Sequence, residues 1–175
     1  AILEDKNGVL WVGTKADGLN MLRKGEPINF VHYRHEPENP NSLSDDKVTS
    51  LIEDNDGILW IGTQSGGLNK FDTQTGVFTH YRHDSKNPKS LSEDYVLSIL
   101  DDRDGMLWIG TQTGGLNRFD KHTGAFTHYR HDPEDPQSLS DDQVYSLYED
   151  SSGALWIGRW MTANGLDRFD KTTET

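Results

Sequence analysis

The residues best suited to metal binding or catalysis recur in one short sequence phrase. His-Tyr-Arg-His stands at residues 32–35, 80–83 and 128–131. Imidazole is the commonest metal ligand in proteins, so the phrase raises the question of metal binding. Residues three apart on a strand point to opposite faces, so the two histidines of one phrase cannot share an ion unless the strand ends between them. We therefore expect no metal site, and we expect these side chains to cover an outer strand, with each arginine pairing with acidic loops.

Carboxylates also recur at fixed places. Asp54 and Asp56 precede Gly57, and the same pattern returns one copy later. This spacing resembles a fragment of a calcium loop, but no bidentate glutamate follows at the spacing that such a loop uses. A tight turn explains these residues more simply. No Ser, His and Asp grouping stands apart from the repeated phrases, so the sequence predicts no catalytic residue and no cofactor.

One phrase breaks the repetition. Residues 158–165 read GRWMTANG, whereas the preceding copy at residues 110–115 is shorter by two residues. Tryptophan and arginine are favoured where proteins recognise partners and ligands. We therefore predict ligand binding by Arg159, Trp160 and Asn164. A drifted loop, or a contact to a further blade, is the alternative.

Four tryptophans define the repeat. Separations of 49, 48 and 48 residues relate Trp11, Trp60, Trp108 and Trp156, which stand in the phrases GVLWVGT, GILWIGT, GMLWIGT and GALWIGR. Aromatic rings of this kind could stack on sugars. Because the residue returns in every copy beside leucine and isoleucine, we predict instead that the four form the structural core between blades.

Each complete copy contains four short β-prone segments. In the second copy they are residues 48–52, 58–63, 67–71 and 77–83. Glycine-marked turns separate them, and only the link from the last segment to the next copy is long. The apolar second segment needs cover on both faces. Four-stranded antiparallel meanders of this kind are the blades of a β-propeller, an all-β fold. A parallel β-solenoid is the rival, but its repeats are usually much shorter.

The copies predict about 3.75 blades in a partial propeller, because the last copy ends before its fourth segment. The expected units are residues 1–47, 48–95, 96–143 and 144–175. The chain begins in mid-repeat, as a piece of a longer protein would. An arc of blades leaves two apolar end faces uncovered. We therefore expect as partners either a second copy in a homo-oligomer, which closes the ring, or the remaining blades of a larger propeller.

The composition of the chain argues against some classes of partner. The 175 residues carry 17 Lys and Arg against 29 Asp and Glu, a formal charge of −12, which disfavours nucleic acid. The longest apolar stretches are a few residues, so this segment is expected to make no membrane contact. There is no cysteine, which removes thiol chemistry and disulfides.

The run from residue 53 to residue 72, Glu-Asp-x-x-Gly-x-Leu-Trp-Ile-Gly-Thr-x-x-Gly-Gly-Leu-Asn-x-Phe-Asp, resembles the two-component regulator propeller repeat. Residues 101–120 and 41–46 fit the same pattern, whereas residues 22–24 of the first copy depart from it. Similar proteins carry such blades, commonly seven, in sensor regions ahead of a membrane span and a histidine kinase or diguanylate cyclase. This chain contains neither membrane helix nor kinase motif.

The resemblance implies a function and a location. It implies a non-catalytic segment that binds a glycan, a small molecule or a partner, on the periplasmic or extracellular side of a membrane-anchored sensor. Fold-level analogy alone supports the ligand class. A purely structural scaffold is the second hypothesis. A propeller-type lyase or glycosidase fragment is the third, although such enzymes need a unique acid or base that the repeats do not offer.

Overall fold

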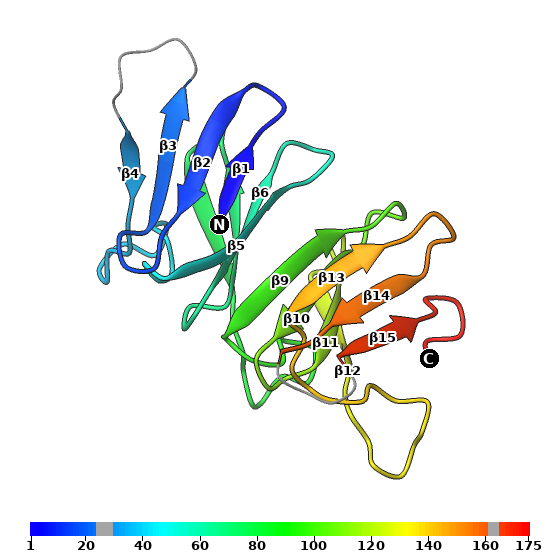
Figure 1. The fold of residues 1–175 in the computed structure, drawn as a ribbon. Coiled ribbons are helices and arrows are strands. Elements are labelled where there is room, and N and C mark those ends of the chain that lie inside the picture. Colours follow the sequence, from blue (N-terminus) through cyan, green and yellow to red (C-terminus); the bar gives the residue numbers. More distant parts are fainter. Residues whose placement is uncertain (24–29, 161–164) are drawn as a thin grey trace.

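The computed structural model describes residues 1–23, 30–160 and 165–175 as a series of antiparallel sheets (Figure 1). Every regular element among these residues is a strand. Blade 1 contains β1 (Ile2–Glu4), β2 (Val9–Gly13), β3 (Leu19–Arg23) and β4 (Val31–Tyr33). Blade 2 contains β5 (Val48–Glu53), β6 (Leu59–Thr63), β7 (Leu68–Asp72) and β8 (Val77–Tyr81). Blade 3 contains β9 (Val96–Asp101), β10 (Leu107–Thr111), β11 (Leu116–Asp120) and β12 (Ala125–Tyr129). Blade 4 contains β13 (Ser146–Glu149), β14 (Leu155–Gly158) and β15 (Leu166–Phe169).

Strands pair in chain order within each blade, so three blades are four-stranded meanders and the last has three strands. This confirms the predicted all-β propeller arc of about 3.75 blades. The tight turns explain the meander. Gly67 has φ +75, and a Cβ there would lie 2.4 Å from the carbonyl oxygen of Tyr81, so only glycine fits. The predicted fourth segment is shorter than expected, because β8 ends at Tyr81.

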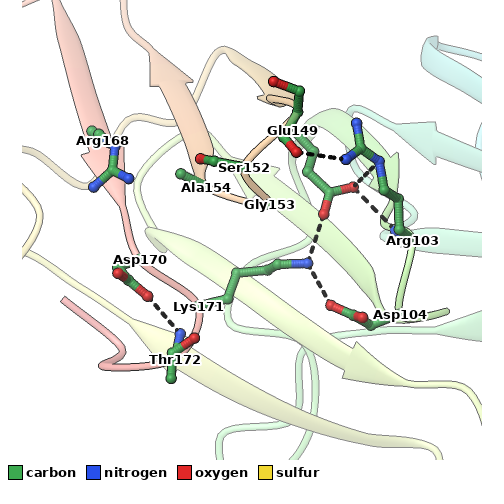
Figure 2. Close-up of a pocket in the computed structure, with 11 residues that line it drawn as sticks. Arg103, Asp104, Glu149, Ser152, Gly153, Ala154, Arg168, Asp170, Lys171 and Thr172 are labelled. Carbon is green, nitrogen blue, oxygen red and sulfur yellow. Dashed lines mark hydrogen bonds and ion pairs between the residues drawn. The ribbon is translucent and has the colours of Figure 1, made fainter.

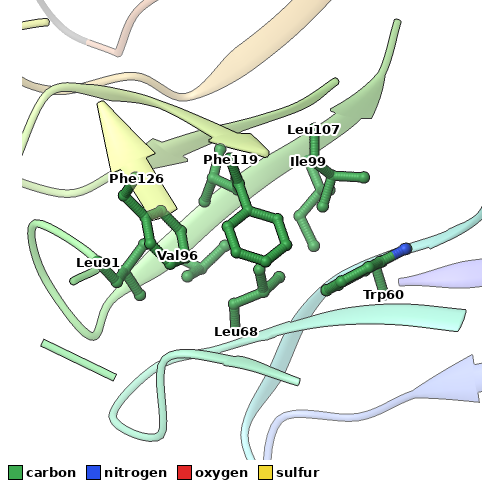
Figure 3. Close-up of a cluster of buried hydrophobic side chains, with 9 residues drawn as sticks. Trp60, Leu68, Leu91, Val96, Ile99, Leu107, Phe119 and Phe126 are labelled. Atoms are coloured by element: carbon green, nitrogen blue, oxygen red, sulfur yellow. The ribbon is translucent and has the colours of Figure 1, made fainter. Parts of the chain in front are cut away.

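Successive blades pack face to face, and the core lies between them. Between blades 2 and 3, Trp60 and Leu68 contact a facing set from the next blade (Figure 3): Val96, Ile99, Leu107, Ile109, Phe119 and Phe126. The ring of Trp60 meets that of Phe119 edge-on, with centroids 5.6 Å apart. Two equivalent clusters fill the other two junctions. All five residues of β6 are buried, as cover on both faces requires.

The first strand of each blade lies innermost. Strands β1, β5, β9 and β13 contact one another in that order, whereas the fourth strands lie at the periphery. Residues at the beginning of these inner strands therefore gather from several blades around one axis. The described residues contain no helix able to cross a membrane.

Candidate binding site and the contacts that position it

An aspartate six residues before each of the four repeat tryptophans holds the indole in place. In blade 2, Asp54 Oδ1 accepts hydrogen bonds from the backbone N–H groups of Asp56 and Ile58, each at 3.0 Å, and Asp54 Oδ2 accepts one from Trp60 Nε1 at 2.8 Å. One carboxylate thus closes the turn and satisfies the buried indole donor. The same indole bond recurs in the pairs Asp5–Trp11, Asp102–Trp108 and Asp150–Trp156.

The tryptophan side of this contact is buried wherever a next blade follows. Trp11, Trp60 and Trp108 are each 1% exposed, and each packs edge-on against a phenylalanine of the following blade. Trp156 makes the same bond to its aspartate but is only partly buried. Asp54 and Asp102, the first carboxylates of the pattern that resembled a calcium loop, therefore accept hydrogen bonds from backbone and indole N–H groups.

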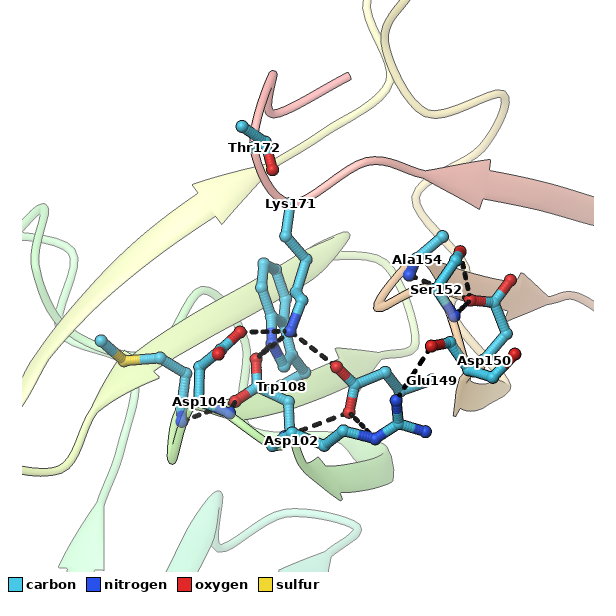
Figure 4. A network of polar contacts seen from close by, with 12 residues as sticks. Asp102, Asp104, Trp108, Glu149, Asp150, Ser152, Ala154, Lys171 and Thr172 are labelled. Atoms are coloured by element: carbon cyan, nitrogen blue, oxygen red, sulfur yellow. Dashed lines mark hydrogen bonds and ion pairs between the residues drawn. The ribbon is translucent and has the colours of Figure 1, made fainter.

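A lysine from the next blade completes this arrangement at two junctions. Lys171 Nζ lies 3.0 Å from Asp102 Oδ2, 2.7 Å from Asp104 Oδ2 and 2.7 Å from Glu149 Oε1 (Figure 4). One oxygen from each of these acids lies within 4.8 Å of the others, a spacing that suits a metal ion, but the ammonium group stands between them. Lys121 Nζ makes the equivalent contacts, 2.8 Å to Asp101 and 3.4 Å to Asp54.

These contacts set the pKa values of the buried aspartates. Burial alone would raise the pKa of Asp54, but the hydrogen bonds from Trp60 and from the backbone N–H of Ile58, together with the charge of Lys121, outweigh it and lower the pKa. The pKa of Asp102 is lowered in the same way, with Trp108 and Lys171 as the main side-chain partners.

We expect acid to destabilise the fold through these two residues. Because each pKa is lower in the folded state, the unfolded chain binds protons first as the pH falls, and the stabilisation present at neutral pH is lost below about pH 4. Thermal melts across this range measure the loss. The double variant Asp54→Asn, Asp102→Asn should begin less stable at pH 7 and lose less on acidification. Parallel pH curves for the two proteins would contradict this assignment.

Five of the six histidines in the repeated phrase lie within hydrogen-bonding distance of a backbone carbonyl oxygen, and His32 lies close to the side-chain oxygen of Asn20. His80 Nε2 lies 2.7 Å from the carbonyl oxygen of Ser42, and His83 Nδ1 lies 2.9 Å from that of Leu91. Strand β8 ends between the two histidines, and each ring secures a different connecting segment. The arginines differ from expectation in one respect. Arg34 pairs with Asp17 at 3.0 Å, as expected, but Arg82 donates to the carbonyl oxygen of Ser44.

A pocket of about 430 Å³ lies beside the lysine contact of blades 3 and 4 (Figure 2). Its wall is formed by charged side chains that already pair with one another, among them Arg103 with Glu149 and Lys171 with Asp104. The charges of these side chains are thus already compensated within the wall of the pocket. The pocket therefore belongs to the junction between the blades.

A second pocket, of about 400 Å³, lies where the inner strands meet. We call it the axial pocket. Residues of all four blades and the segments that lead into them line it: Ala1, Gly13, Lys15, Lys47, Val48, Thr49, Gln64, Tyr95, Leu97 and Tyr145. Two lysines, an amide and two tyrosines offer hydrogen-bond donors and aromatic faces, and none of these lining residues is acidic. The pocket can therefore bind a polar or anionic ligand without opposing carboxylates.

Trp160, at the start of the irregular segment of blade 4, contacts Tyr145, which lines this pocket. Trp160 is 53% exposed, and its ring centroid lies 5.1 Å from that of Tyr145 at an interplanar angle of 35°. Arg159 is placed differently, because its side chain is buried and its guanidinium pairs with Asp167 and with Ser140 Oγ. Asn164 lies outside the described residues. Of the three residues predicted to bind a ligand, Trp160 is the one that contacts a residue lining the axial pocket.

Sequence reasoning missed Tyr145, Tyr95 and the two lysines. A signal was present in the repeats themselves. Val48, Val96 and Val144 occupy the same position in successive copies. The residue before the valine is Lys47, Tyr95 or Gln143, and the residue after it is Thr49, Leu97 or Tyr145. Core positions keep nearly the same residue in every copy, because packing between blades constrains them. Positions whose residue differs between copies are therefore candidates for the surface.

A family model described as two component regulator propeller matches the chain four times, at residues 1–16, 42–65, 90–113 and 138–158. Each match contains the first two strands of one blade, the second of which carries the repeat tryptophan. The second, third and fourth matches also include the end of the link that precedes the blade. None of the curated proteins compared with the chain matches it.

Solved structures show the same arrangement of blades. The extracellular domain of BT4673 from B. thetaiotaomicron, described as a hybrid two component system, has a TM-score of 0.82 and 26% identity, over 99% of this chain and 24% of that one. The extracellular domain of BT3049 from the same organism has a TM-score of 0.73 and 24% identity, over 99% of this chain and 28% of that one. A catalytically inactive virginiamycin B lyase from Staphylococcus aureus has a TM-score of 0.66 at 18% identity.

The similarities to BT3049 and to the virginiamycin B lyase concern the fold alone, since their sequence identities lie below 25%. The chain spans about a quarter of the two B. thetaiotaomicron domains. The four matches follow the repeat, the sheets have the predicted strand order, and the resemblance seen in the sequence is confirmed. The chain belongs to the two component regulator propeller family.

Proposed function

We propose that this chain is a non-catalytic, ligand-binding segment of a sensor protein of two-component type, located on the extracytoplasmic side of a membrane-anchored parent. The axial pocket is its binding site. One observation carries the proposal: the exposed Trp160–Tyr145 ring pair stands beside a pocket whose lining comes from all four blades. The match to the two component regulator propeller model and the similarity to the extracellular domain of BT4673 support the sensor role and the location.

The chemistry of the pocket fits an oligosaccharide. Exposed aromatic rings present flat apolar faces to the C–H side of a sugar ring. Gln64 offers amide groups to hydroxyls, and Lys15 and Lys47 offer ammonium groups that also suit a carboxylate on the sugar. Glycoside hydrolysis needs a pair of carboxylates flanking the bond. The described lining residues contain no carboxylate, so the pocket does not offer the acid pair of a glycoside hydrolase.

We expect Trp160→Ala and Tyr145→Ala to weaken oligosaccharide binding about tenfold, the effect of losing about 1.4 kcal/mol of contact energy. The probes are a panel of neutral and uronate-containing oligosaccharides, and the readout is titration calorimetry of the purified chain. Val77→Ala is the matched control, because Val77 is also exposed but lies on the outer strand β8. It should bind like the wild type.

Two outcomes would overturn the assignment. A bound oligosaccharide whose affinity is the same in Trp160→Ala and Tyr145→Ala would place the site elsewhere. Absence of binding by any member of the panel would favour the alternative of a structural scaffold that holds other sensor elements.

A further inference from the structure

One position that links neighbouring blades changes between copies. Lys121 of blade 3 lies 2.8 Å from Asp101 of its own blade and 3.4 Å from Asp54 of the preceding blade. Burial alone would lower the pKa of Lys121, but the hydrogen bonds and charges of these two aspartates outweigh burial and raise the pKa. Lys171 holds the equivalent place in blade 4, whereas blade 2 has Thr73 there. The junction between blades 1 and 2 therefore lacks the lysine that fills the next two.

Blade 1 nevertheless keeps the aspartate that faces this lysine in the other junctions. Asp5 Oδ2 accepts a hydrogen bond from the indole N–H of Trp11 at 2.8 Å, and Asp102 Oδ2 accepts the same bond from its own tryptophan at 2.7 Å. Asp102 Oδ2 also lies 3.0 Å from the ammonium nitrogen of Lys171. Within the described part of the chain, no lysine or arginine forms an ion pair with Asp5.

Blade 2 keeps the second acid of the arrangement. Glu53 Oε2 accepts the backbone N–H of Lys6 at 2.8 Å, and Glu149 Oε2 accepts that of Arg103, the equivalent residue, at 3.1 Å. The other oxygen of Glu149, Oε1, lies 2.7 Å from Lys171 Nζ. Because the two glutamates are anchored in the same way, Glu53 Oε1 is placed to accept an ammonium group as well.

A pocket of about 410 Å³ opens where the lysine is missing. We call it the blade 1–2 pocket. Its wall includes both Asp5 and Trp11. The pocket between blades 3 and 4 is not lined by Asp102 or its tryptophan, because Lys171 lies over them (Figure 4). In agreement with this difference, Asp5 is 8% exposed and Asp102 is 2% exposed. The missing lysine thus leaves a buried carboxylate open to a ligand.

The rest of the wall suits an organic cation. Apolar and aromatic side chains surround the carboxylate: Val9, Trp11, Met21 and Tyr33. Aromatic faces also attract cations. Asn7 offers an amide oxygen at the position where Asp104 binds the lysine of blade 4. Two cations lie nearby, but Lys6 Nζ donates to the carbonyl oxygen of Asp54 at 2.8 Å, and Arg23 is exposed to solvent, which screens its charge.

We propose that the blade 1–2 pocket binds the ammonium group of a primary amine, held by Asp5 and Glu53 in the place that a lysine occupies in the next two junctions. The site shares no lining residue with the axial pocket, so it is independent of oligosaccharide binding there. Both blades that form it lie inside the chain, and the rest of the ligand contacts the apolar wall.

Thermal melts with n-butylammonium chloride, which copies a lysine side chain, test the proposal. At about five times its dissociation constant, we expect this amine to raise the melting temperature by about 2–4 °C. Potassium chloride at the same ionic strength and n-butanol at the same concentration should not. In ¹H–¹⁵N spectra, the indole N–H signal of Trp11 should shift with the amine, because its acceptor is Asp5 Oδ2.

Three variants locate the site. Thr73→Lys should raise the melting temperature without ligand and abolish the response to the amine, because it supplies the missing ammonium group. Gln74→Lys is the matched control, since it adds a lysine at an exposed position of the same turn and should respond like the wild type. Asp5→Asn should lose the response, because it removes the carboxylate charge.

Four results would overturn the proposal. The first is an unchanged wild-type melting temperature and Trp11 signal at saturating amine. The second is an equal shift in Thr73→Lys, which would place the amine elsewhere. Equal shifts with potassium chloride or with n-butanol would show, respectively, a general salt effect or the filling of an apolar cavity.

Discussion

Trp60→Ala is expected to lower the free energy of unfolding by about 3–5 kcal/mol, the usual cost of removing a large buried aromatic side chain. The ring fills the junction between blades 2 and 3, where it contacts Phe119 edge-on and Tyr81 at a tilt. Its loss leaves a cavity between two sheets and removes the donor that satisfies Asp54. Chemical denaturation followed by circular dichroism measures the change.

Trp156→Ala is the matched control for this prediction. Trp156 makes the same hydrogen bond, to Asp150 at 2.8 Å, and stands on the equivalent strand, but no blade covers its outer side. Its removal should therefore cost clearly less than that of Trp60. Trp60→Phe separates the two contributions, because it keeps most of the packing and removes only the indole donor. Equal losses for Trp60→Ala and Trp156→Ala would contradict the placement of the core between blades.

Lys171→Met should cost about 3–5 kcal/mol, the range found when one partner of a buried ion pair is removed. The ammonium group neutralises Asp102 and Glu149, whose side chains are almost fully buried. Burial alone would lower the pKa of Lys171, but the carboxylates of Asp104, Glu149 and Asp102 outweigh it and raise the pKa. The lysine is therefore charged at neutral pH, and methionine leaves the acids facing one another without a cation.

Two comparisons isolate the charge effect in the same denaturation experiment. Lys86→Met changes an exposed lysine and should alter stability by about 0.5 kcal/mol or less. Lys171→Met combined with Glu149→Gln should recover part of the loss, because it removes one of the uncompensated charges. A double variant that is less stable than Lys171→Met alone would show that the acids are not strained by the missing cation.

The architecture could be predicted because it depends on local and repeated signals. The tryptophan spacing gave the number of blades, and turn glycines such as Gly67 gave the strand boundaries to within two residues. Burial of β6 on both faces followed from its apolar run. Each of these signals lies either within one copy or in the regular spacing between copies, so it can be recognised in the sequence without coordinates.

The candidate site could be predicted only in part, because its contacts join distant residues. The variant loop pointed to Trp160, but its partner Tyr145 lies 15 residues earlier, on a different strand link. Arginine is a residue type favoured at binding sites, yet the contacts of Arg159 with Asp167 and Ser140 hold its side chain inside the blade. The contact between Lys121 and Asp54 joins residues 67 positions apart, which no spacing within one copy reveals.

The bond between each aspartate and its tryptophan also has a consequence for biosynthesis. It joins residues six apart, whereas the facing blade that covers the indole is encoded about 48 residues later. At typical rates of translation, that interval corresponds to roughly 2–10 s. A nascent chain can therefore orient each indole as soon as its hairpin leaves the ribosome. The apolar surface around that indole then stays exposed to other nascent chains until the next repeat emerges.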